Sequence, residues 1–125
     1  MALTTIAAAM SGVITALQTA ATTGAGVVLA IPPSFQNHSF IITAAAAVSA
    51  GAVTVETSND PNDANTWVAI VPDKSIANPL TVSAGADLLI PYSGRLNFVR
   101  ARISTTISGG GAPSVTVNYL GAKSY

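Results

Sequence analysis

The chain has 125 residues, a formal net charge of zero and no cysteine. This length suffices for one domain with its own core, the lack of cysteine excludes disulfides and thiolate metal sites, and the neutral balance argues against a nucleic-acid partner. Only 8% of the residues are charged and 50% are hydrophobic, whereas about 25% are charged in an average soluble domain. We therefore expect other protein molecules to cover much of the surface, through self-association or docking into a larger assembly.

Residues 1–18 carry no charge and are predicted to form an apolar N-terminal arm ahead of a β domain at residues 19–125. Apolar residues recur in the arm at steps of three and four, the helical period: Leu3, Ile6, Met10, Val13 and Leu17. Gly12 and the neighbouring β-branched residues favour an extended segment instead, so a short helix and a strand both remain open. The arm is either a first strand with a frayed end or a segment laid on a neighbouring subunit.

The uncharged first half of the chain raises the question of a membrane segment. Polar residues and the Pro32–Pro33 pair interrupt it, so no apolar run approaches the roughly 20 residues that a spanning helix needs. The first ten residues, MALTTIAAAM, also lack the positive charge that begins a secretory signal. Neither membrane association nor export is predicted.

From residue 19 onward the pattern is that of β structure, because apolar and polar residues alternate between clusters of Gly, Pro, Asn and Ser. Strands are predicted at residues 26–31, 38–44, 52–57, 67–70, 80–82, 88–91, 97–105 and 114–120. In the strand at 97–105, Val99, Ala101 and Ile103 are predicted to face the core. Short strands with frequent turns predict an all-β fold, a jelly-roll-like two-sheet β-sandwich.

The loop that follows the strand at 52–57 is rich in oxygen ligands and ends at the only tryptophan, Trp67. Its acids and amides could surround Ca²⁺: Asn59, Asp60, Asn62, Asp63 and Asn65. Their spacing matches no cation-binding loop, since the glycine and the terminal glutamate of such loops are missing. Asn, Asp and Pro also form turns. The loop is therefore predicted to reverse the chain without a metal and to place Trp67 in the core, with a sugar-stacking Trp67 as the alternative.

Catalytic residues are not predicted. The single histidine, His38, is expected in a loop or an edge strand, and no nucleophile-elbow motif accompanies it. The glycine run within Ser108 to Pro113 is expected to form a hairpin loop at the end of the sandwich, and it precedes a strand rather than a phosphate-binding helix. The chain is expected to be no enzyme and to hold no cofactor and no metal.

Arg100 and Arg102 share the outward face of one predicted strand with Phe98. The face is either solvated or a contact patch, because Arg and aromatic residues are favoured interface anchors. Together with the apolar arm, this face gives the candidate protein-interface residues: Leu3, Ile6, Met10, Phe98, Arg100 and Arg102.

Two segments carry a family resemblance. The sequence VTVETSNDPNDANTWVAI is followed, after about thirty residues, by NFVRARISTTISGGGAPSVTVNYLG, and TAATTGAGVVLAI precedes both. A strand that ends in Ser-Asn-Asp, a turn to Trp-Val, and a later aromatic-Val-Arg-x-Arg strand before a final Val-x-Val strand resemble small virion proteins of tailed bacteriophages. The turn here is longer than the usual Asp-Gly type and contains no Gly.

The resemblance implies a virion β-sandwich protein, and the low charge, the single domain and the apolar arm favour a capsid decoration (cement) protein that binds the major capsid protein and copies of itself. It implies a place on the capsid surface of the virion after assembly in the host cytoplasm, and a homotrimer is favoured because shells offer three-fold sites. The alternative is a tail, baseplate or fibre component that binds a host receptor or carbohydrate, for which solvent-exposed Trp67 or Tyr92 would speak. A tail-tube or neck component is a third possibility.

Overall fold

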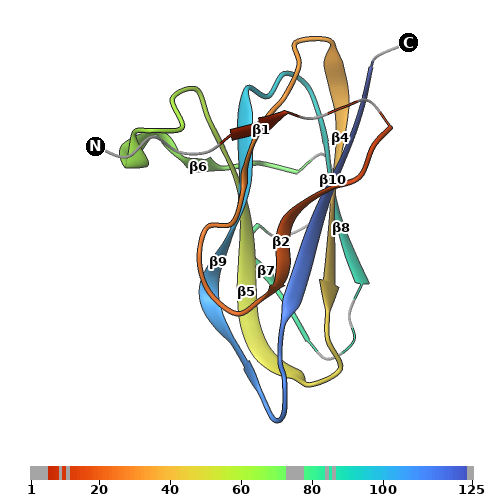
Figure 1. Cartoon of the computed structure of the whole chain (residues 1–125), viewed down its shortest axis with the longest axis vertical. Coiled ribbons are helices and arrows are strands. Elements are labelled where there is room, and N and C mark those ends of the chain that lie inside the picture. Colours follow the sequence, from red (N-terminus) through yellow and green to blue (C-terminus); the bar gives the residue numbers. More distant parts are fainter. Residues whose placement is uncertain are drawn as a thin grey trace.

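The computed structural model describes residues 6–8, 10, 12–72, 78–83, 85 and 87–123, and within them the fold is a two-sheet β-sandwich (Figure 1). Its elements are β1 (Ile6–Ala8), β2 (Thr15–Ala21), β3 (Val28–Ala30), β4 (Phe35–Ala44), β5 (Val48–Ser58), the 3₁₀ helix η1 (Ala64–Thr66), β6 (Val68–Ala69), β7 (Leu80–Thr81), β8 (Asp87–Ser93), β9 (Phe98–Gly109) and β10 (Val115–Lys123). The predicted all-β two-sheet sandwich is confirmed, and each predicted strand overlaps an observed one.

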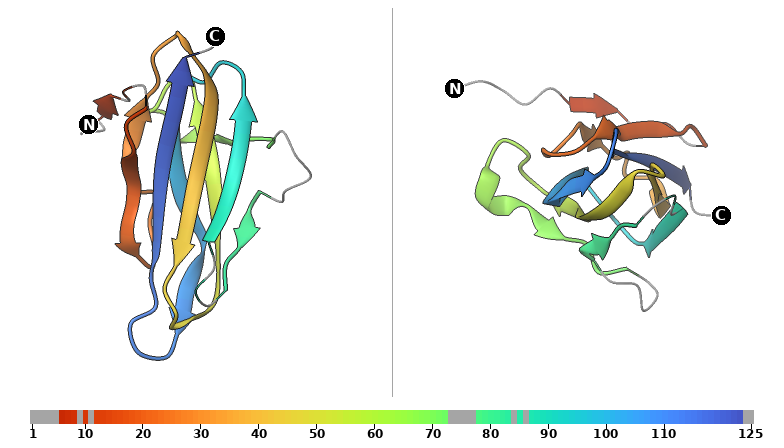
Figure 2. Two further views of the ribbon diagram at one scale, coloured as in Figure 1. Left: turned by 90° about the vertical axis from the view of Figure 1, so that its right-hand side faces the viewer. Right: turned by 90° about the horizontal axis from the view of Figure 1, so that it is seen from below.

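The strands divide between two sheets that face each other (Figure 2). Sheet A has the order β1-β3-β9-β5-β6, with β7 also paired to β5, and sheet B has the order β2-β10-β4-β8. Only β1 and β3 pair in parallel, and the other pairs are antiparallel. The pairing is nested, because β2 pairs with β10, β3 with β9, β4 with β8, and β5 with β6 and β7.

The core lies between the sheets and is built from alternate residues of each strand. In β9, Val99, Ala101 and Ile103 are buried, as the alternation predicts, and they pack with residues of the facing sheet such as Phe40 and Tyr119. The outward neighbours on β9 are only partly buried. One inner and one outer face for each strand is what period-two patterning requires.

The region predicted as an arm contains two strands rather than a helix in its described part. β1 pairs in parallel with β3, while β2 forms one edge of sheet B and crosses the predicted boundary at residue 18. Leu17 in β2 is 1% exposed. The neighbouring Gln18 donates hydrogen bonds to the carbonyls of Ala101 (2.7 Å) and Gly24 (3.0 Å). Because Ala101 belongs to β9, Gln18 ties the edge of sheet B to sheet A.

The other edge of sheet A is completed by a side chain. β6 and β7 cover separate parts of β5, and the Asn78 side chain fills the interval between them. Its amide accepts a hydrogen bond from the Val55 N–H (3.0 Å) and donates to the carbonyls of Val55 (2.9 Å) and Ile70 (2.7 Å). This satisfies backbone groups that an open edge would leave unpaired.

One predicted connection is different. The glycine-rich loop after β9 lies at an end of the sandwich, as predicted (Figure 1). It does not close a hairpin, however, because β9 belongs to sheet A and β10 to sheet B. The local sequence predicts the turn, but which strands pair with β9 and β10 depends on packing between segments that are distant in sequence.

Candidate functional site

A buried carboxylate and two arginines form a cluster on the outer face of sheet A. Glu56 on β5 lies directly opposite Arg100 on β9, and Arg102 follows two residues later on the same face. The Arg100 Nε donates to Glu56 Oε1 at 2.9 Å, and the Arg102 Nε donates to Glu56 Oε2 at 3.2 Å. A single carboxylate therefore pairs with both guanidinium groups.

Burial differs strongly among the three side chains. The Glu56 side chain is 8% exposed, that of Arg100 is 19% exposed and that of Arg102 is 42% exposed. The two arginines shield the carboxylate from water, and Arg102 itself stays accessible. Since one negative charge meets two positive charges, the cluster carries a net charge of +1, and no other ion pair among the described residues offsets it.

Trp67 belongs to this cluster and not to the core, so the prediction that it closes the sandwich is wrong. The Arg100 Cζ lies 4.2 Å from the centroid of the Trp67 ring, a cation–π contact. Trp67 is half-buried and precedes β6, the short strand beside β5. The loop from β5 to β6 carries the ring back over the outer face, where the arginine supplies a partner that the sequence pattern does not show.

The acidic loop does reverse the chain, as predicted, by local hydrogen bonds. Asp60 accepts from the Asn62 N–H (3.3 Å), and Asp63 caps η1 by accepting from the Asn65 N–H (3.0 Å). The Thr66 hydroxyl lies 2.7 Å from the carbonyls of both Asp60 and Asp63. Among the described residues, no group of three or more His, Asp or Glu side chains is placed to hold a metal ion.

His38 is neither in a loop nor on an edge strand, contrary to the prediction. It lies in β4, between β10 and β8, and is buried. Its Nε2 lies 2.7 Å from the Gly94 carbonyl and its Nδ1 lies 2.6 Å from the Tyr119 hydroxyl. A carbonyl only accepts, so Nε2 carries a proton, and in the neutral tautomer Nδ1 would accept from the Tyr119 hydroxyl. The ring therefore fastens β4 to β10 and to the turn after β8, and burial raises the pKa of Tyr119 above its usual value.

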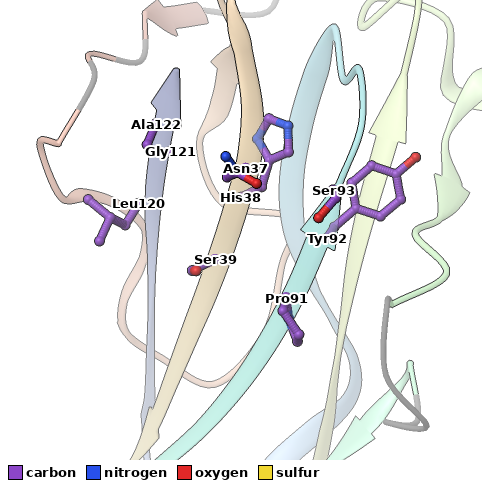
Figure 3. Close-up of a pocket in the computed structure, with 9 residues that line it drawn as sticks. All are labelled: Asn37, His38, Ser39, Pro91, Tyr92, Ser93, Leu120, Gly121 and Ala122. Carbon is purple, nitrogen blue, oxygen red and sulfur yellow. The ribbon is translucent and has the colours of Figure 1, made fainter. Parts of the chain in front are cut away.

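The outer face of sheet B carries a shallow depression of about 280 Å³ (Figure 3). Leu120, Ser39 and Pro91 form one row across its three strands, and Asn118, Ile41 and Leu89 form the next. Figure 3 shows Leu120 and Ser39 on one side of the sheet and the rings of His38 and Tyr92 on the other. Neither row contains a charged residue, and Leu89 is 50% exposed.

The remaining candidate interface residues are placed as follows. Leu3 lies outside the described residues. Ile6 is in β1, two strands from the arginines of β9 in the same sheet. Met10 is 64% exposed in the connection to β2, and Phe98 is half-buried beside Arg100. The structure thus brings Phe98, Arg100 and Arg102 together, as predicted for one strand face, and places β1 of the predicted arm in their sheet.

Comparisons of the sequence with protein-family models and curated proteins, and of the structure with solved structures, find no match. The class that fold and site define is therefore a two-sheet β-sandwich with a two-arginine surface cluster. Within the described ranges, no helix is long and apolar enough to cross a membrane. The likeness to phage virion proteins stays a prediction that rests on the quoted motifs.

Glu56 is the site residue that the sequence prediction misses, since it is not among the candidate interface residues. A usable signal was present. Glu56, Arg100 and Arg102 are the Asp, Glu, Lys or Arg residues that fall within the predicted strands, and opposite charges on outward faces favour pairing of the two strands. The Trp67 contact has no comparable signal, because it depends on the path of a loop.

Proposed function

We propose that the chain is a structural protein of a tailed-bacteriophage virion, a capsid decoration (cement) protein. It would bind the major capsid protein and copies of itself on the capsid surface, with a trimer as the favoured assembly. The observation that carries the proposal is the pair of uncharged central rows on the outer face of sheet B, where Leu89, Ile41 and Leu120 lie among small polar residues. A face of this kind suits burial against another protein.

The strand pairing gives further support. Nested pairs divided between two sheets, with the first strand of sheet B beside the last strand of the chain, are in keeping with the jelly-roll form of the sandwich, which is used by viral capsid proteins and by lectins. This support is an analogy of fold, and the site has to carry the function. The mechanism is linkage: a protein that binds only the assembled shell stabilises that shell by mass action.

The test uses mature shells of the encoding phage from which decoration protein has been removed. Purified chain should pellet with these shells and shift their thermal disruption upward. Leu89→Asp, which places a charge on the outer face of sheet B, should reduce pelleting strongly. Val71→Asp is the matched control, because Val71 is 80% exposed, follows β6 of sheet A and belongs to neither uncharged row of sheet B. Absence of pelleting, together with a monomer in sedimentation at high concentration, would refute the proposal.

A receptor- or carbohydrate-binding tail component is the second candidate, favoured by the place of Trp67. The ring lies on the outer face of sheet A rather than in the core, and aromatic rings at a surface can stack on sugars. A glycan array with the isolated chain tests it. Binding that is lost in Trp67→Ala would support this candidate over the decoration protein.

A further inference from the structure

We propose that Arg100 and Arg102 form a binding site for a carboxylate, supplied by an Asp or Glu side chain of the partner protein. The inference rests on the proposed function and deepens it, because it names what the arginine cluster, on the side opposite to sheet B, takes from a second protein molecule of the assembly. Its test uses small molecules and the isolated chain. If the small-molecule test is negative, the chain can still bind shells. If the chain does not bind shells, the carboxylate site can still be present.

The first argument is the balance of charge. One carboxylate satisfies one guanidinium group, yet Glu56 is shared by two. A buried ion cluster is seldom more stable than hydrophobic side chains of similar volume, because desolvation of the charges offsets most of their attraction. In a chain with only ten charged residues, a second arginine at this place is better explained by a second anion than by the stability of the fold.

The second argument is the supply of hydrogen-bond donors. Both arginines use Nε for Glu56. Within the described part of the chain, the terminal amino groups of both arginines have no hydrogen-bond partner. The terminal groups of a guanidinium form a planar fork whose geometry matches a carboxylate. Glu56 holds both guanidinium groups through Nε, so their terminal amino groups can donate hydrogen bonds to a carboxylate of another molecule.

The third argument is that the donors are held in place and can be reached. Arg100 is fixed on two sides, by Glu56 and by the Trp67 ring at 4.2 Å. Arg102 is fixed by Glu56 at one end only, and 42% of its side chain is exposed. A ligand therefore approaches Arg102 from solvent and meets donors that have already lost much of their rotamer freedom, which lowers the entropy cost of binding.

The chemistry of the surroundings selects a protein carboxylate. A net charge of +1 is too small for a phosphate backbone, which needs several cations in a row. A sugar would need a free aromatic face, but the Trp67 face toward this site is occupied by Arg100. Phe98, half-buried on the same face of β9, offers an apolar neighbour for the methylene groups of a glutamate.

The experiment is an NMR titration that observes the Nε–H signals of Arg100 and Arg102 and the indole N–H of Trp67. The probe is N-acetylglutamate amide, and the matched control is N-acetylglutamine amide, which has the same shape without the charge. The glutamate probe should shift these signals in a saturable way and the glutamine probe should not. In Arg102→Gln the affinity should fall roughly tenfold, the loss of one charge-assisted hydrogen bond.

Three controls define the outcome. Arg95→Gln removes one positive charge away from the cluster and should leave the affinity unchanged. Arg102→Lys keeps the charge but not the fork, and its affinity should lie between those of the wild type and Arg102→Gln. N-acetylneuraminic acid serves as a glycan carboxylate. Equal shifts with the glutamate and glutamine probes, undiminished binding in a folded Arg102→Gln, or tighter binding of N-acetylneuraminic acid than of the glutamate probe would overturn the proposal.

Discussion

Glu56 is the residue whose replacement tests the cluster most directly. Glu56→Gln keeps the shape of the side chain and removes its charge, so that two arginines on one face lose their shared partner. Breaking a buried ion pair by removing one partner costs about 3 to 5 kcal/mol. The Arg102 side chain is 42% exposed, so water solvates its charge when Glu56 is lost. We therefore expect the free energy of unfolding to fall by about 3 kcal/mol, the low end of this range.

The two arginines should contribute unequally. Arg100 is 19% exposed, makes the shorter bond to Glu56 and stacks on Trp67, so Arg100→Ala should cost about 2 to 3 kcal/mol. Arg102→Ala removes a largely solvated partner and should cost less than about 1 kcal/mol. A double-mutant cycle should give a larger coupling energy for Glu56 with Arg100 than for Glu56 with Arg102.

Urea unfolding followed by circular dichroism and by Trp67 fluorescence measures these free energies. Measurements at several protein concentrations separate unfolding from dissociation. The Arg102 coupling should vanish in 1 M salt, whereas the Arg100 coupling should largely persist because it is buried. Equal costs for the two arginine variants, or a Glu56→Gln cost below about 1 kcal/mol, would refute the view that burial decides the strength of these pairs.

Three further predictions concern the core. Gly121→Ala would drive a methyl group into the Tyr119 hydroxyl and should lower stability by about 1 to 3 kcal/mol, while Gly110→Ala, with nothing within 4 Å, should leave the melting temperature unchanged. Gln18→Ala removes the link from β2 to β9 and should speed amide exchange in β2, at a cost of about 1 to 3 kcal/mol. Because burial raises the pKa of Tyr119, the folded state keeps a proton that the unfolded chain loses above about pH 10. The free energy of unfolding should therefore be unaffected by this group below that pH and should fall above it by up to about 1.4 kcal/mol per pH unit. The variant Tyr119→Phe should lose this pH dependence.

The strands and their buried faces could be predicted from the sequence because both depend on local pattern. Val99, Ala101 and Ile103 face the core because side chains alternate between the two faces of a strand and these three are the apolar set. The sequence leaves residues 1–18 open between a short helix and a strand, because their apolar residues recur at the helical period. Only the pairing of β2 with β10, at the opposite end of the chain, decides the matter.

The candidate site could be predicted only in part, for a related reason. Arg100 and Arg102 share a face by their spacing alone. Their partner Glu56 lies 44 residues away in sequence from Arg100, and its place depends on the register between β5 and β9. His38 was misplaced since its flanking Asn and Pro residues are typical of a loop, while its ring is satisfied by Tyr119 and by the backbone of Gly94.

The two outer faces differ in a way that matters for any partner. Sheet A places its charges in one cluster around Glu56, whereas the central rows of sheet B carry none. An uncharged face contributes buried area on binding but discriminates poorly between orientations of the bound chain. A charged group that must pair with an opposite charge on the partner protein fixes the orientation and disfavours other partners. A chain that docks with sheet B alone should therefore bind in several orientations. Because Arg102 lies on the opposite side of the sandwich, a second protein molecule that engages it should select one orientation, so Arg102→Gln should reduce the order of the bound chain more than the amount bound.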